Sequence, residues 1–139
     1  MQAIDIPSGF ENVELFDGIA SPATFKFAPD GRLFFGERIN GRLRVARFNA
    51  AAGTWQANNR PFYTFDVPKN GAGVPTAHRS SGLRDIEFDP DFASNGYVYV
   101  FYMNNDPRHN RVVRIRANPA DPDVAVAGSE ELLIELPFN

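Results

Sequence analysis

The same turn-and-strand pattern occurs twice in this chain, and this internal repeat limits the possible folds more than any other feature. Residues 25–35 read FKFAPDGRLFF, and residues 86–99 read IEFDPDFASNGYVY. The second copy has a few additional residues in its turn and begins about 60 residues after the first. Each copy therefore indicates one structural unit, and the chain contains two such units.

Short runs of β-forming residues separated by turn signals make up most of the sequence, and helical periodicity is almost absent. Pro29-Asp30-Gly31 and Asn40-Gly41 are typical of tight hairpin turns. The leucine-rich run 131–136 is compatible with a strand or with a helical turn. The irregular stretch 68–81 is long enough to be functional or mobile. The remaining runs predict strands at residues 13–16, 23–27, 32–37, 42–48, 62–67, 83–88, 97–102 and 111–116.

A repeat that contains about four strands favours the blade of a β-propeller. Residues 97–102 are apolar on both faces of the expected strand, so we expect both faces to be buried between neighbouring blades. The prediction is an all-β, partial β-propeller in a single domain over residues 1–139. It has about two four-stranded antiparallel blades, blade one at about 21–67 and blade two at about 81–136. Two blades cannot close a ring, so the chain is a piece of a longer propeller or a subunit that completes one by assembly.

Composition excludes several classes of function. The chain has no cysteine, which excludes disulfides, thiolate metal sites and cysteine nucleophiles. His78 and His109 are the only histidines, which leaves little room for a histidine metal site. Seventeen acidic residues against fourteen basic ones argue against a nucleic-acid surface. No run is apolar enough for a membrane-spanning helix, and no signal peptide is visible.

Several segments resemble the glucose/sorbosone dehydrogenase family, soluble quinoproteins with six-bladed β-propellers. The likeness covers nearly the whole chain. Its most specific part is GLRDIEFDPDF at residues 82–92 with NGYVYV at 95–100. Weaker parts, which other propellers share, are PSGF at 7–10, FAPDGRL at 27–33, Glu37-Arg38 and GRLRV at 41–45.

The resemblance implies sugar oxidation with pyrroloquinoline quinone (PQQ), held with the help of calcium. In the family, the catalytic base is a histidine in a His-x-Gly-Gly-like segment, which takes the proton of the sugar C1 hydroxyl while hydride passes to the quinone. This chain ends at Asn139, just before the expected position of that segment, and neither His78 nor His109 matches the base. The resemblance therefore places the catalytic residues, the calcium ligands and most quinone contacts beyond Asn139. It also implies that Val13–Phe16 is the ring-closing strand of the last blade.

Two residues of this chain are candidates for cofactor binding. The family has a glutamine just before the inner strand of blade two, beside the quinone, and Ser80 stands at that position here. Serine has neither the reach nor the amide of glutamine. Arg79 is an alternative donor to the quinone carboxylates. The family also includes propellers without a demonstrated enzymatic role, so the fold alone does not decide activity.

Other readings of the local motifs remain open. The segment 78–81 either lines the mouth of a central channel or forms a surface loop whose hydroxyls bond the backbone. His78 and Ser80 are too close in sequence for a typical nucleophile–base geometry. Asp89, Asp91, Ser94 and Asn95 superficially resemble a calcium loop. Counting from Asp89, the EF-hand glycine and glutamate positions hold Ser94 and Val100, so a turn that bonds its own backbone is favoured.

Polar residues within expected strands have two interpretations. Arg84 and Asp85 form an ion pair within or between blades, or they line a polar channel. Glu37 and Arg38 are interpreted as a hairpin charge pair rather than a catalytic dyad. An aromatic series could stack on sugars, but its spread over both strand faces favours a core between blades; it comprises Phe34, Phe35, Tyr97, Tyr99, Phe101 and Tyr102.

The sequence therefore supports two hypotheses of function. In the first, the chain is the N-terminal portion of a PQQ-dependent aldose dehydrogenase-like oxidoreductase and is inactive alone. Its complete protein would act on a sugar with an electron acceptor, in the periplasm or outside the cell, where family members are usually exported. In the second, the chain is a non-catalytic module that binds carbohydrate or protein, completed when three copies assemble into one ring.

Overall fold

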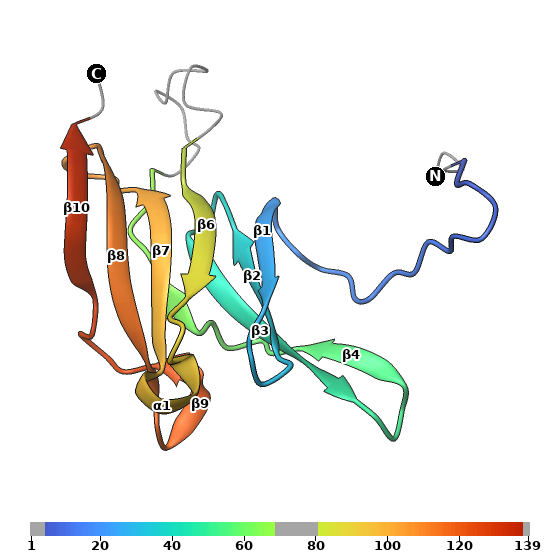
Figure 1. Cartoon of the computed structure of the whole chain (residues 1–139). Helices are drawn as coiled ribbons and strands as arrows, with labels where there is room; N and C mark the ends of the chain where they lie inside the picture. The colour runs from blue at the N-terminus through green and yellow to red at the C-terminus, as the bar shows by residue number, and fades with distance from the viewer. Residues whose placement is uncertain (1–4, 69–80, 138–139) are drawn as a thin grey trace.

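The first of two antiparallel sheets follows the chain order (Figure 1). The computed structural model describes residues 5–68 and 81–137. Neighbouring strands run in the order β1-β2-β3-β4, and β5 pairs with the other end of β3. The strands are β1 (Pro22–Phe27), β2 (Leu33–Glu37), β3 (Arg42–Asn49), β4 (Thr54–Ala57) and β5 (Tyr63–Thr64). The predicted hairpin at Asn40-Gly41 joins β2 to β3, with Gly41 at a φ of 65° that favours glycine.

The second sheet repeats this plan. Its order is β10-β8-β7-β6, with β9 paired to β8. A short helix, α1 (Phe92–Asn95), fills the longer turn of the second repeat. The strands are β6 (Leu83–Phe88), β7 (Tyr97–Met103), β8 (His109–Asn118), β9 (Asp121–Ala125) and β10 (Glu131–Pro137). The all-β prediction is confirmed, and the run 131–136 is a strand rather than a helical turn. No helix in the described residues is long and apolar enough to cross a membrane.

The main core lies between the two sheets. The ring of Phe34 packs edge-on against Phe62 and Phe88, with ring centroids 5.0 Å apart in both contacts. Tyr102 and Phe65 lie in the same cluster, 4.8 Å apart. A second, smaller cluster on the opposite face of the first sheet consists of Leu33, Phe35 and Ala46, covered in part by Phe16, Ile19, Trp55 and Ala57. Both faces of the first sheet are therefore apolar, as expected for a blade with two neighbours.

The aromatic series is only partly buried within the described residues, and burial of its other members between blades stays a prediction. Phe34, Phe35 and Tyr102 are buried. The other members, Tyr97, Tyr99 and Phe101, are partly exposed. Because side chains alternate along a strand, these three residues point to the face of β7 that no described element covers. Residues 97–102 are thus buried on one face, not on both.

The segment Val13–Phe16 forms no strand in this structure, contrary to expectation. It is extended chain beside the first sheet, with Phe16 packed on Phe35 at a centroid distance of 5.2 Å. A strand requires a hydrogen-bonded partner strand, and no described strand pairs with this segment. Ring closure by these residues therefore remains an implication of the family resemblance.

A buried carboxylate holds the end of β2 against β3. The side chain of Glu37 is inaccessible to solvent, and its oxygens lie 2.9 Å from Arg44 Nη1 and 2.7 Å from Arg42 Nε. Arg44 also donates to the carbonyl of Asn58 through Nε and Nη2, at 3.1 and 3.0 Å. Burial raises the pKa of Glu37, but the hydrogen bond from Arg44 and the nearby positive charges together bring it below its ordinary value. Glu37 is therefore ionised and fixes the β2–β3 hairpin.

A second polar network joins the two sheets. The Arg32 guanidinium is 5% exposed and contacts Asp30 at 2.7 Å and Asp123 at 3.1 Å. It also donates to the carbonyl of Pro122. Arg47 completes the network with an ion pair to Asp123 at 2.8 Å. These contacts connect the β1–β2 turn to β9 of the second sheet and complement the apolar core.

We expect Glu37→Gln to lower the free energy of unfolding by about 3 kcal/mol, because it removes one partner of a buried ion cluster. The matched control is Glu87→Gln, which removes a carboxylate that is 64% exposed and paired with Lys26. Its effect should stay below about 1 kcal/mol. Urea unfolding followed by circular dichroism measures both. Equal losses for the two variants would contradict the structural role of Glu37.

The free energy of unfolding should also fall as the pH drops below the ordinary carboxyl range. The pKa of Glu37 lies below its value in an unfolded chain, so the unfolded state binds more protons in acid and gains stability relative to the native state. The contribution of Glu37 to the free energy of unfolding is complete at pH values above its pKa in the unfolded chain. It is lost as the pH falls through the pKa of Glu37 in the native state. Urea titrations at several pH values should therefore show a shallower acid dependence for Glu37→Gln. An identical pH profile for both proteins would contradict this assignment.

Candidate functional site

The candidate site begins where the two sheets meet edge to edge. β1 and β6 are edge strands of their sheets and lie side by side in Figure 1. Thr24 Oγ1 donates to Asp85 Oδ1 at 3.1 Å, and Lys26 forms an ion pair with Glu87. These exposed pairs give the shared edge a polar surface. In a propeller, the first strand of each blade lines the central channel, so this edge is the part of the chain that would face it.

The start of β6 is fixed tightly to the end of β2. The backbone N–H of Leu83 donates to the carbonyl of Arg38 at 3.1 Å, and Arg38 Nη1 donates to the carbonyl of Ser81 at 3.4 Å. Gly82 adopts a φ of 102°, and a Cβ on it would lie 2.1 Å from the Arg38 carbonyl oxygen. Only glycine fits this close approach.

The predicted cofactor residues Arg79 and Ser80 lie outside the described residues, as does His78. Ser81, the next residue along the chain, is buried. Of the candidate segment 78–81, the structure therefore describes Ser81 alone. The contacts predicted for Arg79 and Ser80 are not tested by it. Their assignment stays a prediction.

The contacts of Arg84 and Asp85 do not support the interpretation of these residues as an ion pair, and the alternative, a polar channel lining, stays a prediction. Asp85 accepts from Thr24 of the first sheet, and Arg84 lies over the ring of Phe101, with Cζ 5.8 Å from its centroid. Arg84 and Asp85 therefore do not pair with each other. The reason is a register shift between Leu83 and Asp85 at the start of β6. A bulge of this kind re-aims adjacent side chains.

The proposed Glu37–Arg38 charge pair is also replaced. Glu37 at the end of β2 points into the sheet toward Arg42 and Arg44. Arg38 is the next residue along the chain and directs its guanidinium to the carbonyl of Ser81. Adjacent residues point in opposite directions at the end of a strand, so a sequential pair need not be a spatial pair. The sequence did not indicate that Arg38 contacts the chain at the start of β6.

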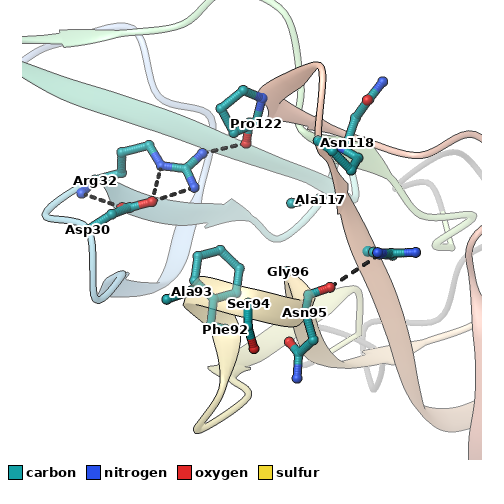
Figure 2. Close-up of a pocket in the computed structure, with 12 residues that line it drawn as sticks. Asp30, Arg32, Phe92, Ala93, Ser94, Asn95, Gly96, Ala117, Asn118 and Pro122 are labelled. Carbon is teal, nitrogen blue, oxygen red and sulfur yellow. Dashed lines mark hydrogen bonds and ion pairs between the residues drawn. The ribbon is translucent and has the colours of Figure 1, made fainter.

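A crevice opens at the end of the molecule that carries α1 and β9 (Figure 2). Its volume is about 210 Å³, below the usual range of drug-sized ligand pockets. Asp30 and Arg32 lie on one side, Ser94 and Asn95 on the helix side, and Asn118 on the opposite side. Phe92 and two prolines supply the apolar part of its lining. Such a space admits one small polar molecule.

The polar groups of the crevice mostly serve the fold. Arg32 is occupied by Asp30, Asp123 and the carbonyl of Pro122. Ser94 Oγ donates to the carbonyl of Asp91 at 2.9 Å. Burial raises the pKa of Asp30, but the hydrogen bonds and charge of Arg32 lower it further, so the carboxylate stays ionised. We therefore interpret the crevice as part of the interface between the sheets rather than as a reactive centre.

The Asp89 loop is a turn, as the spacing favoured. Asp89 accepts hydrogen bonds from the Asp91 N–H at 2.9 Å, Asn95 Nδ2 at 2.8 Å and the Tyr99 hydroxyl at 2.7 Å. The hydrogen bonds from Tyr99 and Asn95 hold the pKa of Asp89 below its ordinary value. Every oxygen of this carboxylate has a protein partner. The loop has no cation-binding geometry.

The described residues do not fit a calcium site. Within residues 5–68 and 81–137, no three histidine, aspartate or glutamate side chains gather closely enough to hold a metal ion. His109 Nδ1 lies 3.1 Å from the Glu135 carboxylate, which also pairs with Arg111. No step of a reaction can be assigned to calcium from this part of the chain.

The sequence model of the family described as glucose/sorbosone dehydrogenase matches residues 19–138. The chain belongs to the glucose/sorbosone dehydrogenase family. The match includes both sheets and the junction between β2 and β6. No curated protein sequence matches the chain.

Solved structures share the fold of this glucose/sorbosone dehydrogenase chain. One is the PQQ-bound form of an aldose sugar dehydrogenase from Streptomyces coelicolor, with a TM-score of 0.56 and 20% identity over 87% of this chain. Two glucose dehydrogenases give TM-scores of 0.62 and 0.59, with 23% and 22% identity over 88% of this chain. The chain spans 32% of each of these structures. At these identities the likeness establishes the fold, which is a partial β-propeller.

In this glucose/sorbosone dehydrogenase chain, Gly82→Ala should destabilise the junction by at least about 2 kcal/mol, because it adds a clash with Arg38 to the cost of a positive φ. Gly128→Ala is the matched control: Gly128 has a φ of 72° and no atom within 4 Å of an added Cβ. It carries only the backbone cost, about 1 kcal/mol. Thermal and urea unfolding report the difference. Similar losses of unfolding free energy for both variants would show that the close approach of Gly82 to the Arg38 carbonyl does not affect stability.

Proposed function

We propose that this chain is the N-terminal portion of a PQQ-dependent aldose dehydrogenase and that it supplies scaffold and part of the channel rim rather than catalytic residues. The observation that carries the proposal is the family match over residues 19–138, which coincides with the two described sheets. The PQQ-bound state of one structural neighbour supports the choice of cofactor. An exported location, periplasmic or secreted, is part of the same proposal.

Within the complete protein, the residues of this chain would act by positioning. The Arg38–Gly82 junction fixes the start of β6, the strand that follows the candidate residues Arg79 and Ser80 in the sequence. These two residues are the candidate contacts with the quinone, Arg79 as a charged donor and Ser80 in place of the family glutamine. The pairs Thr24–Asp85 and Lys26–Glu87 keep the edges of two blades together along the channel.

The chemistry itself is assigned to residues outside this chain. PQQ, when bound, would accept the two electrons released by oxidation of the sugar at C1. Among the described residues, His109 Nδ1 lies against the Glu135 carboxylate, and Asp85 and Glu87 at the shared edge of β1 and β6 contact Thr24 and Lys26. These contacts support a structural role for the two carboxylates at that edge.

The purified 139-residue chain should not oxidise aldoses in a dye-linked assay with PQQ and calcium added. The product of the open reading frame that contains this chain should reduce the dye with an aldose, and only after loading with PQQ. Absorbance titration of that product with PQQ gives binding separately from turnover. Turnover by the 139-residue chain, or absence of PQQ binding by the longer product, would overturn the proposal.

A further inference from the structure

Two asparagine–glycine pairs in the described residues differ in how firmly the fold holds them. Asn40-Gly41 lies in the turn between β2 and β3, and Asn95-Gly96 lies between α1 and β7. A third pair, Asn70-Gly71, lies outside the described residues. In such a pair the glycine nitrogen can attack the asparagine side chain, because glycine has no Cβ to block the approach. The reaction therefore depends on how freely the linking peptide group rotates.

The peptide group that links Asn40 to Gly41 lies between two backbone carbonyls that are fixed by hydrogen bonds. The Arg38 carbonyl accepts from the Leu83 N–H at 3.1 Å, and the Gly41 carbonyl accepts from the Phe65 N–H at 2.8 Å. Within the part of the chain that the structure describes, no residue bonds to the Asn40 carbonyl, the Gly41 N–H or the exposed Asn40 side chain. The linking group can therefore rotate and bring the Gly41 nitrogen to the side-chain carbonyl of Asn40.

Asn95 has the opposite environment. The N–H of Gly96 donates to a carbonyl within α1 at 2.8 Å, and the Asn95 carbonyl accepts from Arg116 Nε at 3.2 Å (Figure 2). In the side chain, Asn95 Nδ2 donates to Asp89 at 2.8 Å, and Oδ1 accepts from the Tyr97 N–H at 2.9 Å. The groups that would have to move are thus all hydrogen-bonded. Breaking these bonds adds to the barrier for attack at Asn95.

We propose that Asn40 is a site of spontaneous modification to aspartate and isoaspartate, whereas the fold protects Asn95. The Gly41 nitrogen forms a bond to Cγ of Asn40, and the side-chain nitrogen leaves as ammonia with the proton of the Gly41 N–H. Water then opens the resulting succinimide ring at either carbonyl, which gives aspartate or isoaspartate. The reaction involves no change of oxidation state and no cofactor, so the proposal is independent of the proposed function.

Isoaspartate at position 40 would alter the junction that fixes the start of β6. It adds a methylene to the main chain between the Arg38 and Gly41 carbonyls, which hold the N–H groups of Leu83 and Phe65. The turn has little room for added length, since a Cβ on Gly41 would already lie 2.4 Å from the Phe65 carbonyl oxygen. The modified turn therefore holds Leu83 and Phe65 less firmly.

Timed incubation of the product of the open reading frame that contains this chain tests the site. Peptide mapping by mass spectrometry reads asparagine, aspartate and isoaspartate at each position separately. We expect Asn40 to be lost at least about tenfold faster than Asn95, a difference of about 1.4 kcal/mol in activation free energy. In the urea-unfolded protein the two rates should approach each other, because the protecting hydrogen bonds are absent. Equal loss at both positions of the folded protein, or faster loss of Asn95, would overturn the proposal.

Asp89→Ala tests the protection of Asn95. The variant removes the acceptor of Asn95 Nδ2, so loss of Asn95 should accelerate while loss of Asn40 stays unchanged. Circular dichroism before incubation separates a local effect from loss of fold. An unchanged rate at Asn95 in the folded variant would contradict protection by this hydrogen bond.

Hydrogen exchange tests the consequence for the junction. Peptides that contain the N–H groups of Leu83 and Phe65 should exchange faster in incubated protein than in fresh protein, because the carbonyls of the turn hold them less firmly. Asn40→Gln is the matched control, since its longer side chain closes the corresponding ring much more slowly. Its incubated and fresh samples should exchange alike. Unchanged exchange in wild-type protein that carries isoaspartate at position 40 would overturn the effect on the junction.

Discussion

The apolar contact between the two sheets is the constraint on which the rest of the structure depends. A sheet that is apolar on one face can leave its other face in water, but both sheets of this chain carry aromatic residues on both faces. Phe34, Phe88 and Tyr102 fill the space between the sheets and thereby fix the relative position of β1 and β6. The polar pairs along the channel edge and the Arg38–Gly82 junction can form only because that packing brings the two strands together. The polar edge shared by β1 and β6 is thus a consequence of the core.

Charged residues refine this arrangement without driving it. Glu37 is fully buried between Arg42 and Arg44, and its desolvation offsets much of its attraction to them. Glu37 contributes to the specificity of the fold, because an unpaired carboxylate at this depth would destabilise any alternative register of the β2–β3 hairpin. Arg32 acts similarly between sheets, where Asp30 and Asp123 hold it over the ring of Phe34. These networks select one packing among several that hydrophobic burial alone would allow.

The sequence predicted the elements well because their signals are local. Turn dipeptides, alternation and the repeat indicated two sheets and most of their strands, and Asn40-Gly41 forms the turn that its chemistry favours. The strands β4 and β9 were not predicted. The partners of charged side chains were predicted poorly, since those depend on strand ends and bulges. Glu37 pairs with residues across the hairpin rather than with Arg38, and Asp85 pairs with Thr24 rather than with Arg84. The burial of Tyr99 and Phe101 depends on a partner outside the sheet, which no local pattern can supply. The candidate cofactor residues Arg79 and Ser80 were proposed from family resemblance, and their role stays a prediction.

The two copies of the repeat differ in charge along the edge where their sheets meet. Equivalent positions in the two sheets hold opposite charges, Lys26 in one and Glu87 in the other, so the two repeats are complementary rather than identical. A propeller built from identical blades would place like charges together along its channel, which costs stability. When blades of unlike charge alternate, that repulsion is absent. Two sheets are then the smallest unit in which opposite charges face each other along the edge shared by β1 and β6. Thr24–Asp85 and Lys26–Glu87 join β1 to β6, so substitutions along this shared edge also change how the two sheets associate.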